Sequence, residues 1–265
     1  MPHARINGQN LYFEDSGGSG LPVILGHGFL MDHEMFAPQV EVLAGEFRVI
    51  TWDERGFGLT EFDGQPFSYW DSARDCLGLM DHLGLERAVV GGMSQGGYLS
   101  LRLALSAPER VLGLVLIDTQ AAAEHDDKRA AYRQMLDAWA EHGPVDPLAQ
   151  TIATIIIDEP AENARWIAKW RARPKALIRE PGRCLLERDD ISPRLSEITC
   201  PAIVIHGTRD SAIGMEAAQA LADGLGGCDG VVAVDGAAHA ANLTHPDQVN
   251  PPLQAFLRRL AAAQP

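Results

Sequence analysis

Short apolar runs alternate along this chain with segments in which apolar residues recur every three or four positions. A continuous apolar run is typical of a strand buried on both faces, and the longer spacing is typical of a helix with one buried face. A regular succession of strand, helix and strand predicts parallel pairing with crossover helices. The pattern therefore predicts an α/β fold with a mostly parallel central sheet and helices on both of its faces.

The same pattern assigns individual elements to residue ranges. Strands are expected at 10–14, 23–25, 47–52, 88–92, 111–117, 202–205 and 231–234. Helices are expected at 35–43, 69–83, 95–107, 216–225 and 247–260. The first strand, Asn10–Glu14, leads into the turn DSGGSG, and we expect it at an edge of the sheet.

The alternation stops after Asp118, and residues 120–197 are rich in Ala, Arg, Glu and Trp without a convincing strand. Three or four helices are expected there. The expected breaks lie near Gly143-Pro144, Pro160, Pro174 and Pro181. The segment TIATIII (151–157) is β-branched like a strand, but its neighbours favour a helix. The chain is thus divided into an α/β core, residues 1–119 and 198–265, and a helical lid insert, residues 120–197.

Composition and charge limit the kinds of function that this chain can have. With 265 residues, 46% of them hydrophobic, the chain can form a sizeable core without metal or disulfides. The net charge is −14, and basic residues cluster no further than pairs, which argues against a nucleic-acid partner. No apolar run could span a membrane, and the polar N-terminus lacks a secretory signal, so we expect no membrane association and a cytoplasmic location.

No cofactor or metal is expected. None of the four cysteines forms a CxxC pair, which argues against a zinc site. The first strand turn lacks the GxGxxG fingerprint of a dinucleotide site. The oligomeric state is left open, a homo-oligomer included.

The chemistry is expected at strand ends, because ligands of open α/β sheets bind beyond the carboxyl ends of the strands. The stretch GMSQG (92–96) follows a predicted strand, precedes a predicted helix and fits the pattern G-x-S-x-G. In that sharp turn the serine has a strained backbone and its hydroxyl projects outward. Ser94 is therefore the candidate nucleophile, and a glycine-rich turn with a capping serine is the alternative interpretation.

A serine hydroxyl needs a base, and the base needs a carboxylate that orients it. His239 lies just beyond the last predicted strand, and Asp210 ends the loop after the preceding strand. We take them as candidate base and acid. Alternatively, Asp210 caps a helix and His239 is a surface loop residue; Asp118, which also follows a strand, is the rival acid.

Acyl transfer builds negative charge on a carbonyl oxygen, which N–H donors must stabilise. One candidate donor is the backbone N–H of Gln95, directly after the serine. The other is the backbone N–H of Phe29, in the loop opened by His27-Gly28. These two groups are the predicted oxyanion hole.

Five stretches together carry a resemblance to a known family. They are GHGF (26–29), DERGFG (53–58), GMSQGG (92–97), HGTRD (206–210) and GAAHAANLTHPDQV (236–249). The set resembles the α/β-hydrolase superfamily of serine hydrolases, and within it small bacterial esterases, 3-oxoadipate enol-lactonases and cofactor-free perhydrolases. The resemblance implies the α/β-hydrolase fold. It also implies Ser94, Asp210 and His239 as nucleophile, acid and base, Phe29 and Gln95 as the oxyanion hole, and the insert as a lid.

The predicted function is therefore a serine hydrolase that cleaves a carboxylic ester or lactone, its small-molecule partner, through an acyl-enzyme intermediate. C–C bond hydrolysis of a ring-cleavage product, perhydrolysis and a non-catalytic ligand receptor on the same fold are the alternatives. Trp139 and Trp166 of the insert are candidate walls of the substrate pocket, unless they only pack the insert against the core. An inward arginine of the insert could bind a substrate carboxylate. The candidates are Arg165, Arg171, Arg173, Arg179 and Arg183.

Overall fold

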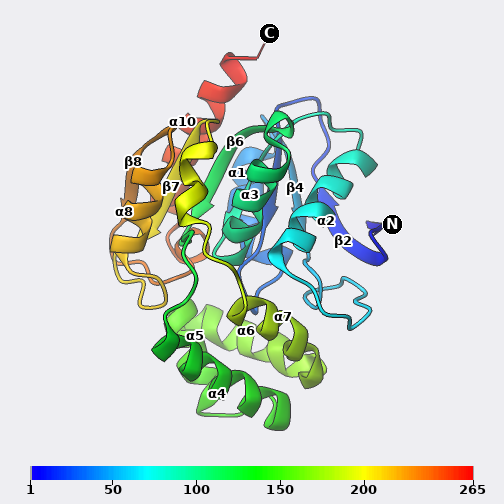
Figure 1. Ribbon diagram of the computed structural model, residues 1–265, viewed down its shortest axis with the longest axis vertical. Coiled ribbons are helices and arrows are strands. Elements are labelled where there is room, and N and C mark those ends of the chain that lie inside the picture. The colour runs from blue at the N-terminus through cyan, green and yellow to red at the C-terminus, as the bar shows by residue number, and fades with distance from the viewer. Residues whose placement is uncertain (1, 265) are drawn as a thin grey trace.

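The computed structural model describes residues 2–264, and an eight-stranded sheet runs through its centre (Figure 1). The strands are β1 (His3–Ile6), β2 (Gln9–Asp15), β3 (Pro22–Gly26), β4 (Arg48–Trp52), β5 (Ala88–Met93), β6 (Val111–Ile117), β7 (Ala202–Gly207) and β8 (Cys228–Val234). They lie in the order β1-β2-β4-β3-β5-β6-β7-β8. The pairs from β4 to β8 are parallel, and β1–β2 and β2–β4 are antiparallel. The predicted mostly parallel sheet is confirmed.

The predicted edge strand is wrong. β2 covers the expected segment Asn10–Glu14, but β1 pairs along its outer side, with Ile6 opposite Gln9. β1 is only four residues long and alternates between buried and more exposed positions, so it carries a weak apolar signal. The turn between the two strands, Asn7-Gly8, has φ values of 48° and 85°. An Asn-Gly pair is a strong hairpin signal that could have revealed β1.

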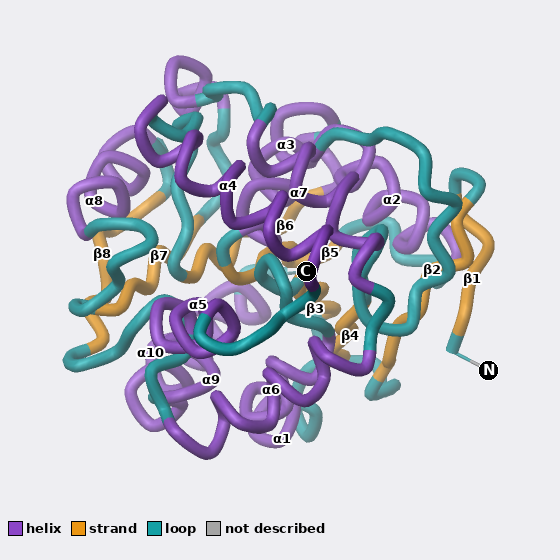
Figure 2. Tube along the Cα trace, turned by 90° about the horizontal axis from the view of Figure 1, so that it is seen from below, coloured by secondary structure: helices purple, strands orange, loops and turns teal. Residues whose placement is uncertain are grey.

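Helices cover both faces of the sheet (Figure 2). On one face lie α1 (Ala37–Leu43), α9 (Ala241–Thr244) and α10 (Pro246–Ala262), and on the other lie α2 (Tyr69–His82), α3 (Gln95–Ser106) and α8 (Met215–Gly224). Neighbouring residues of a central strand face different cores, since Val89 packs in the first and Val90 in the second. Short 3-10 helices occur at His33–Phe36, Pro108–Arg110, Lys175–Ile178 and Ser192–Glu197.

Residues 120–197, between β6 and β7, contain α4 (Asp126–His142), α5 (Leu148–Ile156), α6 (Pro160–Ala172) and α7 (Arg179–Leu186). These four helices lie together beyond one end of the sheet (Figure 1). All of TIATIII except its last residue belongs to α5, as expected. The break expected near Pro181 lies just before it, because α7 begins at Arg179 and Pro181 belongs to its first turn. At that position a proline removes no hydrogen bond within the helix.

Candidate active site

Ser94 lies at a sharp turn from strand to helix. It sits between β5 and α3 with φ 51° and ψ −110°. A residue other than glycine rarely adopts a positive φ, and the strain persists only where the surroundings hold it. The N–H of Ser94 donates to the carbonyl of Ile117 at 2.9 Å. Gly92 and Gly96 lie so close to Gly26 that a β-carbon on either would overlap the Gly26 carbonyl oxygen. The predicted strained turn is therefore present.

Asp210 and His239 form a buried hydrogen-bonded pair. Nδ1 of His239 lies 2.7 Å from Oδ2 of Asp210. Oδ1 of Asp210 accepts from the backbone N–H groups of Ala212 and Ile213 at 2.8 and 2.9 Å. Asp210 does not cap α8, whose N-cap is Gly214. Because the carboxylate is fixed through both oxygens, it holds the proton of His239 on Nδ1 and leaves Nε2 able to accept one.

Burial and charge act in opposite directions on this pair. Burial would lower the pKa of His239, but the carboxylate of Asp210 outweighs burial and raises that pKa above its ordinary value of 6.5. Burial would likewise raise the pKa of Asp210, but His239 and the N–H of Ile213 hold it below its ordinary 3.8. An ionised carboxylate beside an imidazole of increased proton affinity suits a general base.

Asp118, the rival acid, has different contacts. Its Oδ1 accepts from the N–H of Gly207 at 2.8 Å, and its Oδ2 accepts from the N–H of Ala241 at 3.0 Å. Burial, and then the charge of Asp210, raise the pKa of Asp118 to about 8. Asp118 therefore joins β7 to the segment just after His239, whereas Asp210 is the carboxylate bonded to the imidazole.

Ser94 and His239 line one cavity of about 300 Å³, which we call the Ser94 cavity. Most of its other lining side chains are apolar and come from the insert. The insert residues that line the cavity are Glu124, Ala131, Tyr132, Met135, Leu148, Thr151, Ile152, Ile155, Ile156 and Leu185. The five from α5 follow the spacing of a single helical face, which is the sequence signal that could have identified them.

Trp139 and Trp166 do not line the Ser94 cavity, so their assignment to the substrate pocket is wrong. Both line a second cavity of about 250 Å³, enclosed by α4, α6 and the loops after β3 and β4. Both indoles are buried, and the ring of Trp139 packs 5.7 Å from that of Trp170. Leu30 lines both cavities.

A buried ion pair stands at the wall of the Ser94 cavity. Glu124 lines the cavity, and its Oε2 accepts from Nη2 of Arg188 at 2.9 Å. The Arg188 guanidinium lies 4.7 Å from the centre of the Tyr98 ring. Lys128 is more distant, with Nζ 3.9 Å from Oε1 of Glu124. Glu124, Arg188 and Tyr98 belong to no recognised motif, so no sequence signal selects them.

The five arginines considered for a substrate carboxylate do not line the Ser94 cavity. Arg165, Arg171 and Arg183 form ion pairs with acidic side chains. Arg173 donates to the carbonyls of Gly56 and Gly58, each at 2.7 Å. Four of the five, all except Arg179, therefore make structural contacts within the protein.

The peptide that carries the N–H of Phe29 is held from its carbonyl side. That carbonyl belongs to Gly28, and the N–H of Met31 donates to it at 3.0 Å, which closes a turn. Nε2 of His27 accepts from the N–H of Glu54 at 3.0 Å, so Nδ1 carries the proton and donates to Gly28 O at 2.8 Å. A peptide group is planar, so fixing the carbonyl also fixes the N–H on its opposite side.

Both predicted oxyanion donors are available. Among residues 2–264 the N–H of Phe29 has no hydrogen-bond partner, and Phe29 lines the Ser94 cavity. Gln95 is the first residue of α3, where N–H groups have no partner within the helix. The N–H of Gly96 donates to the carbonyl of His27 at 3.1 Å and so joins the two segments. Fixed, unpaired donors are typical of an oxyanion hole, and this role stays a prediction.

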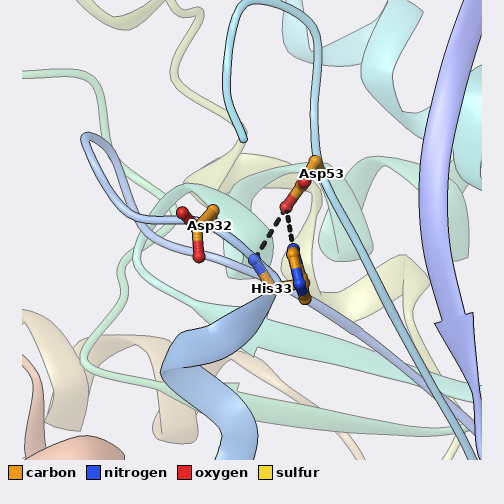
Figure 3. Close-up of side chains that lie close together, drawn as sticks. All are labelled: Asp32, His33 and Asp53. Atoms are coloured by element: carbon orange, nitrogen blue, oxygen red, sulfur yellow. Dashed lines mark hydrogen bonds and ion pairs between the residues drawn. The ribbon is translucent and has the colours of Figure 1, made fainter. Parts of the chain in front are cut away.

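A further cluster lies beside the second cavity. Asp32, His33 and Asp53 offer ligand atoms within 4.8 Å of one another. Figure 3 shows that Asp53 accepts from the backbone N–H of His33, at 2.7 Å, and bonds its ring nitrogen, at 2.8 Å. Nζ of Lys169 lies 2.6 Å from Oδ2 of Asp32 and supplies a positive charge there. The contacts connect the loops after β3 and β4 to each other and to α6.

These features define a class of α/β enzymes in which a serine lies at the sharp turn between a strand and a helix. A family model described as the alpha/beta hydrolase fold matches residues 22–246. The chain therefore belongs to the alpha/beta hydrolase fold family. None of the helices within residues 2–264 has the length and apolar character needed to cross a membrane.

Similar proteins agree with this family. A putative carbamate hydrolase RutD from Azorhizobium caulinodans is 29% identical, over 97% of this chain and 98% of its own. A solved structure of a thermophilic esterase from Thermogutta terrifontis matches with a TM-score of 0.90 and 28% identity, over 98% of this chain and 100% of that one. The enol-lactonase from Burkholderia xenovorans LB400 matches with a TM-score of 0.87 and 26% identity, over 97% and 100%. Family and relatives together support a hydrolytic enzyme.

Proposed function

We propose that this protein is a serine hydrolase that cleaves carboxylic esters through an acyl-enzyme intermediate on Ser94. The observation that carries the proposal is that Ser94, on its strained turn, and His239, bonded to Asp210, line the same cavity. A hydroxyl, an oriented base and a carboxylate are the parts that nucleophilic acyl transfer needs. The similarity to an esterase and an enol-lactonase supports the same reaction class.

In the proposed reaction Oγ of Ser94 attacks the carbonyl carbon, and its proton passes to Nε2 of His239. The negative oxygen accepts hydrogen bonds from the N–H groups of Phe29 and Gln95. When the intermediate collapses, the C–O bond to the alcohol breaks and Nε2 returns the proton to the leaving oxygen. Water then gives a proton to His239 and attacks the acyl-enzyme; the bond between the acyl carbon and Oγ breaks, and Nε2 returns that proton to Oγ, which releases the acid and restores Ser94.

The cavity supports a substrate with an uncharged, apolar acyl group. Apolar side chains of α4 and α5 form most of the wall, so residues 120–197 would act as a lid that selects the acyl group. Neither a lysine nor an arginine within residues 2–264 lines this cavity, and the lining carboxylate of Glu124 is already paired with Arg188, so a substrate carboxylate would meet no free guanidinium or ammonium group there. Neutral esters and neutral lactones therefore fit the site better than a lactone that carries a carboxylate.

An activity panel tests the proposal. The panel contains p-nitrophenyl acetate, butyrate and hexanoate, an enol-lactone with a carboxylate, and a ring-cleavage diketone acid. We expect turnover of the neutral esters, and Ser94→Ala should lower kcat by about 10³-fold or more while the melting temperature stays close to that of the wild type.

Three results would contradict the proposal. A Ser94→Ala variant with a near wild-type rate would remove Ser94 from the mechanism. Turnover of the diketone acid alone would favour C–C hydrolysis. Bromination of monochlorodimedone with peroxide and acetate, without ester cleavage, would favour perhydrolysis.

A further inference from the structure

The turn after β3 contains a residue that is unfavourable for its backbone. Gly28 and Met31 close this turn with a hydrogen bond, and Leu30, its third residue, has a φ of 66°. A positive φ at the third position of a turn favours glycine, because a β-carbon is strained there. Leu30 is nonetheless buried in this conformation, directly after the predicted oxyanion residue Phe29. Neighbouring groups must therefore hold it.

One of these groups comes from the insert. The indole Nε1–H of Trp170, on α6, donates to the carbonyl of Leu30 at 2.7 Å, and both residues are buried. The preceding residue of α6, Lys169, pairs with Asp32. The core holds the peptide before Phe29 through the ring of His27, whereas α6 holds the residues after it.

We infer that Trp170 is a positioning residue for the oxyanion hole and acts through the carbonyl of Leu30. The inference rests on the proposed function, because it requires an oxyanion at the N–H of Phe29. With the indole bond in place, the turn keeps its strained shape and the N–H of Phe29 stays directed at the cavity. Without that bond, Leu30 relaxes toward a negative φ and the turn loses the hydrogen bond from Met31 N–H to Gly28 O, which is one of the two bonds that fix the peptide carrying the N–H of Phe29. The insert then influences the chemical step as well as the choice of substrate.

Three variants separate this role from simple packing. Trp170→Phe keeps an aromatic ring but removes the N–H donor. Trp170→His removes more bulk, yet Nε2 of histidine occupies the same place in its ring as Nε1 in indole, so an N–H donor is kept. Trp139→Phe is the matched control, because Trp139 lines the same cavity as Trp170 and no hydrogen bond of its indole is found within residues 2–264.

The measurements are kcat and KM for p-nitrophenyl butyrate and the inhibition constant of phenylboronic acid, which forms a tetrahedral adduct with an active serine. Loss of an oxyanion donor lowers turnover about 10²–10³-fold, and a misaligned donor should lower it by about tenfold. We expect Trp170→Phe to lower kcat and to weaken boronate binding by about this tenfold factor, with KM changed less than about twofold. Trp139→Phe should change each value by less than about twofold, and Trp170→His should be faster than Trp170→Phe.

The inference would be overturned if Trp170→Phe and Trp139→Phe changed kcat and boronate binding equally. It would also be overturned if Trp170→His had a lower kcat than Trp170→Phe. Melting temperatures show whether each variant folds. If Trp170→Phe does not fold, the comparison of Trp170→His with Trp139→Phe decides, because retention of kcat by Trp170→His supports the N–H role. Failure of the proposed function looks different: the wild type itself would then bind no boronate, and Ser94→Ala would keep its activity.

Discussion

The substitution Asp210→Asn separates the two tasks of this carboxyl group. Asparagine retains Oδ1, so the bonds from the N–H groups of Ala212 and Ile213 can persist and the loop after β7 keeps its shape. An amide NH₂ replaces Oδ2 and faces Nδ1–H of His239, which lies 2.7 Å away. Two donors cannot bond, so the imidazole moves its proton to Nε2. A protonated Nε2 cannot accept the proton of Ser94.

The expected loss in kcat is about 10³–10⁴-fold, which corresponds to about 4–5.5 kcal/mol of transition-state stabilisation. This exceeds the roughly 0.5–1.5 kcal/mol of an ordinary hydrogen bond, because the wrong tautomer blocks the proton transfer itself. The variant should also lower the pKa of His239, since the charge of Asp210 is what raises that pKa against burial. The activity that remains should therefore fall off at a lower pH than in the wild type.

The assay is kcat/KM for p-nitrophenyl butyrate across the pH range from about 5 to 9. Asp118→Asn is the matched control, because it changes the neighbouring buried carboxyl that bonds Gly207 and Ala241. It should cost roughly 1–3 kcal/mol of stability, from one poorly satisfied backbone donor, and leave kcat within about threefold. An Asp210→Asn variant within about tenfold of the wild type, or an equal loss in Asp118→Asn, would refute the assignment of Asp210.

Three further predictions concern the wall of the Ser94 cavity, the buried carboxyl group of Glu54 and the sharp turn at Ser94. Met135→Trp should lower kcat/KM for p-nitrophenyl hexanoate about tenfold more than for the acetate, because the larger ring fills the Ser94 cavity; equal losses would contradict this. Burial raises the pKa of Glu54 to about 8, so the unfolded chain loses this proton from about pH 4.5 upward while the folded protein keeps it. The free energy of unfolding should therefore fall between about pH 5 and 8. In Glu54→Gln, the free energy of unfolding measured in urea should depend less on pH over this range; the same pH dependence as in the wild type would contradict the raised pKa. Gly96→Ala should lower the free energy of unfolding, measured in urea, by about 3 kcal/mol or more, because the new β-carbon would overlap the carbonyl of Gly26. A variant as stable as the wild type would contradict this prediction.

The core of the fold could be predicted because buried parallel strands are continuous apolar runs. β6 occupies the predicted residues 111–117, and all seven are buried. β1 could not be recognised in the same way, because it has only four residues and one face of it is more exposed. Its position at the edge is set by pairing with β2, a tertiary contact that an apolar pattern does not encode.

The candidate catalytic residues could be selected because the sheet brings its strand ends together, and Ser94, Asp210 and His239 each follow a strand. The cavity walls are different. Met135 and Trp139 lie one turn apart on α4, yet the first lines the Ser94 cavity and the second lines the other cavity. Which turn of α4 faces the serine depends on how the insert packs on the core, and helical periodicity alone does not determine that packing.

Covalent labelling tests the central claim most directly. A fluorophosphonate reacts only with a hydroxyl that a neighbouring base has activated, so it reports the joint action of Ser94, His239 and Asp210. After labelling and proteolysis, mass spectrometry should find the phosphonyl group on Ser94, and the Ser94→Ala and His239→Ala variants should remain unlabelled. Ester hydrolysis by a wild-type protein that takes up no label at Ser94 would contradict the account.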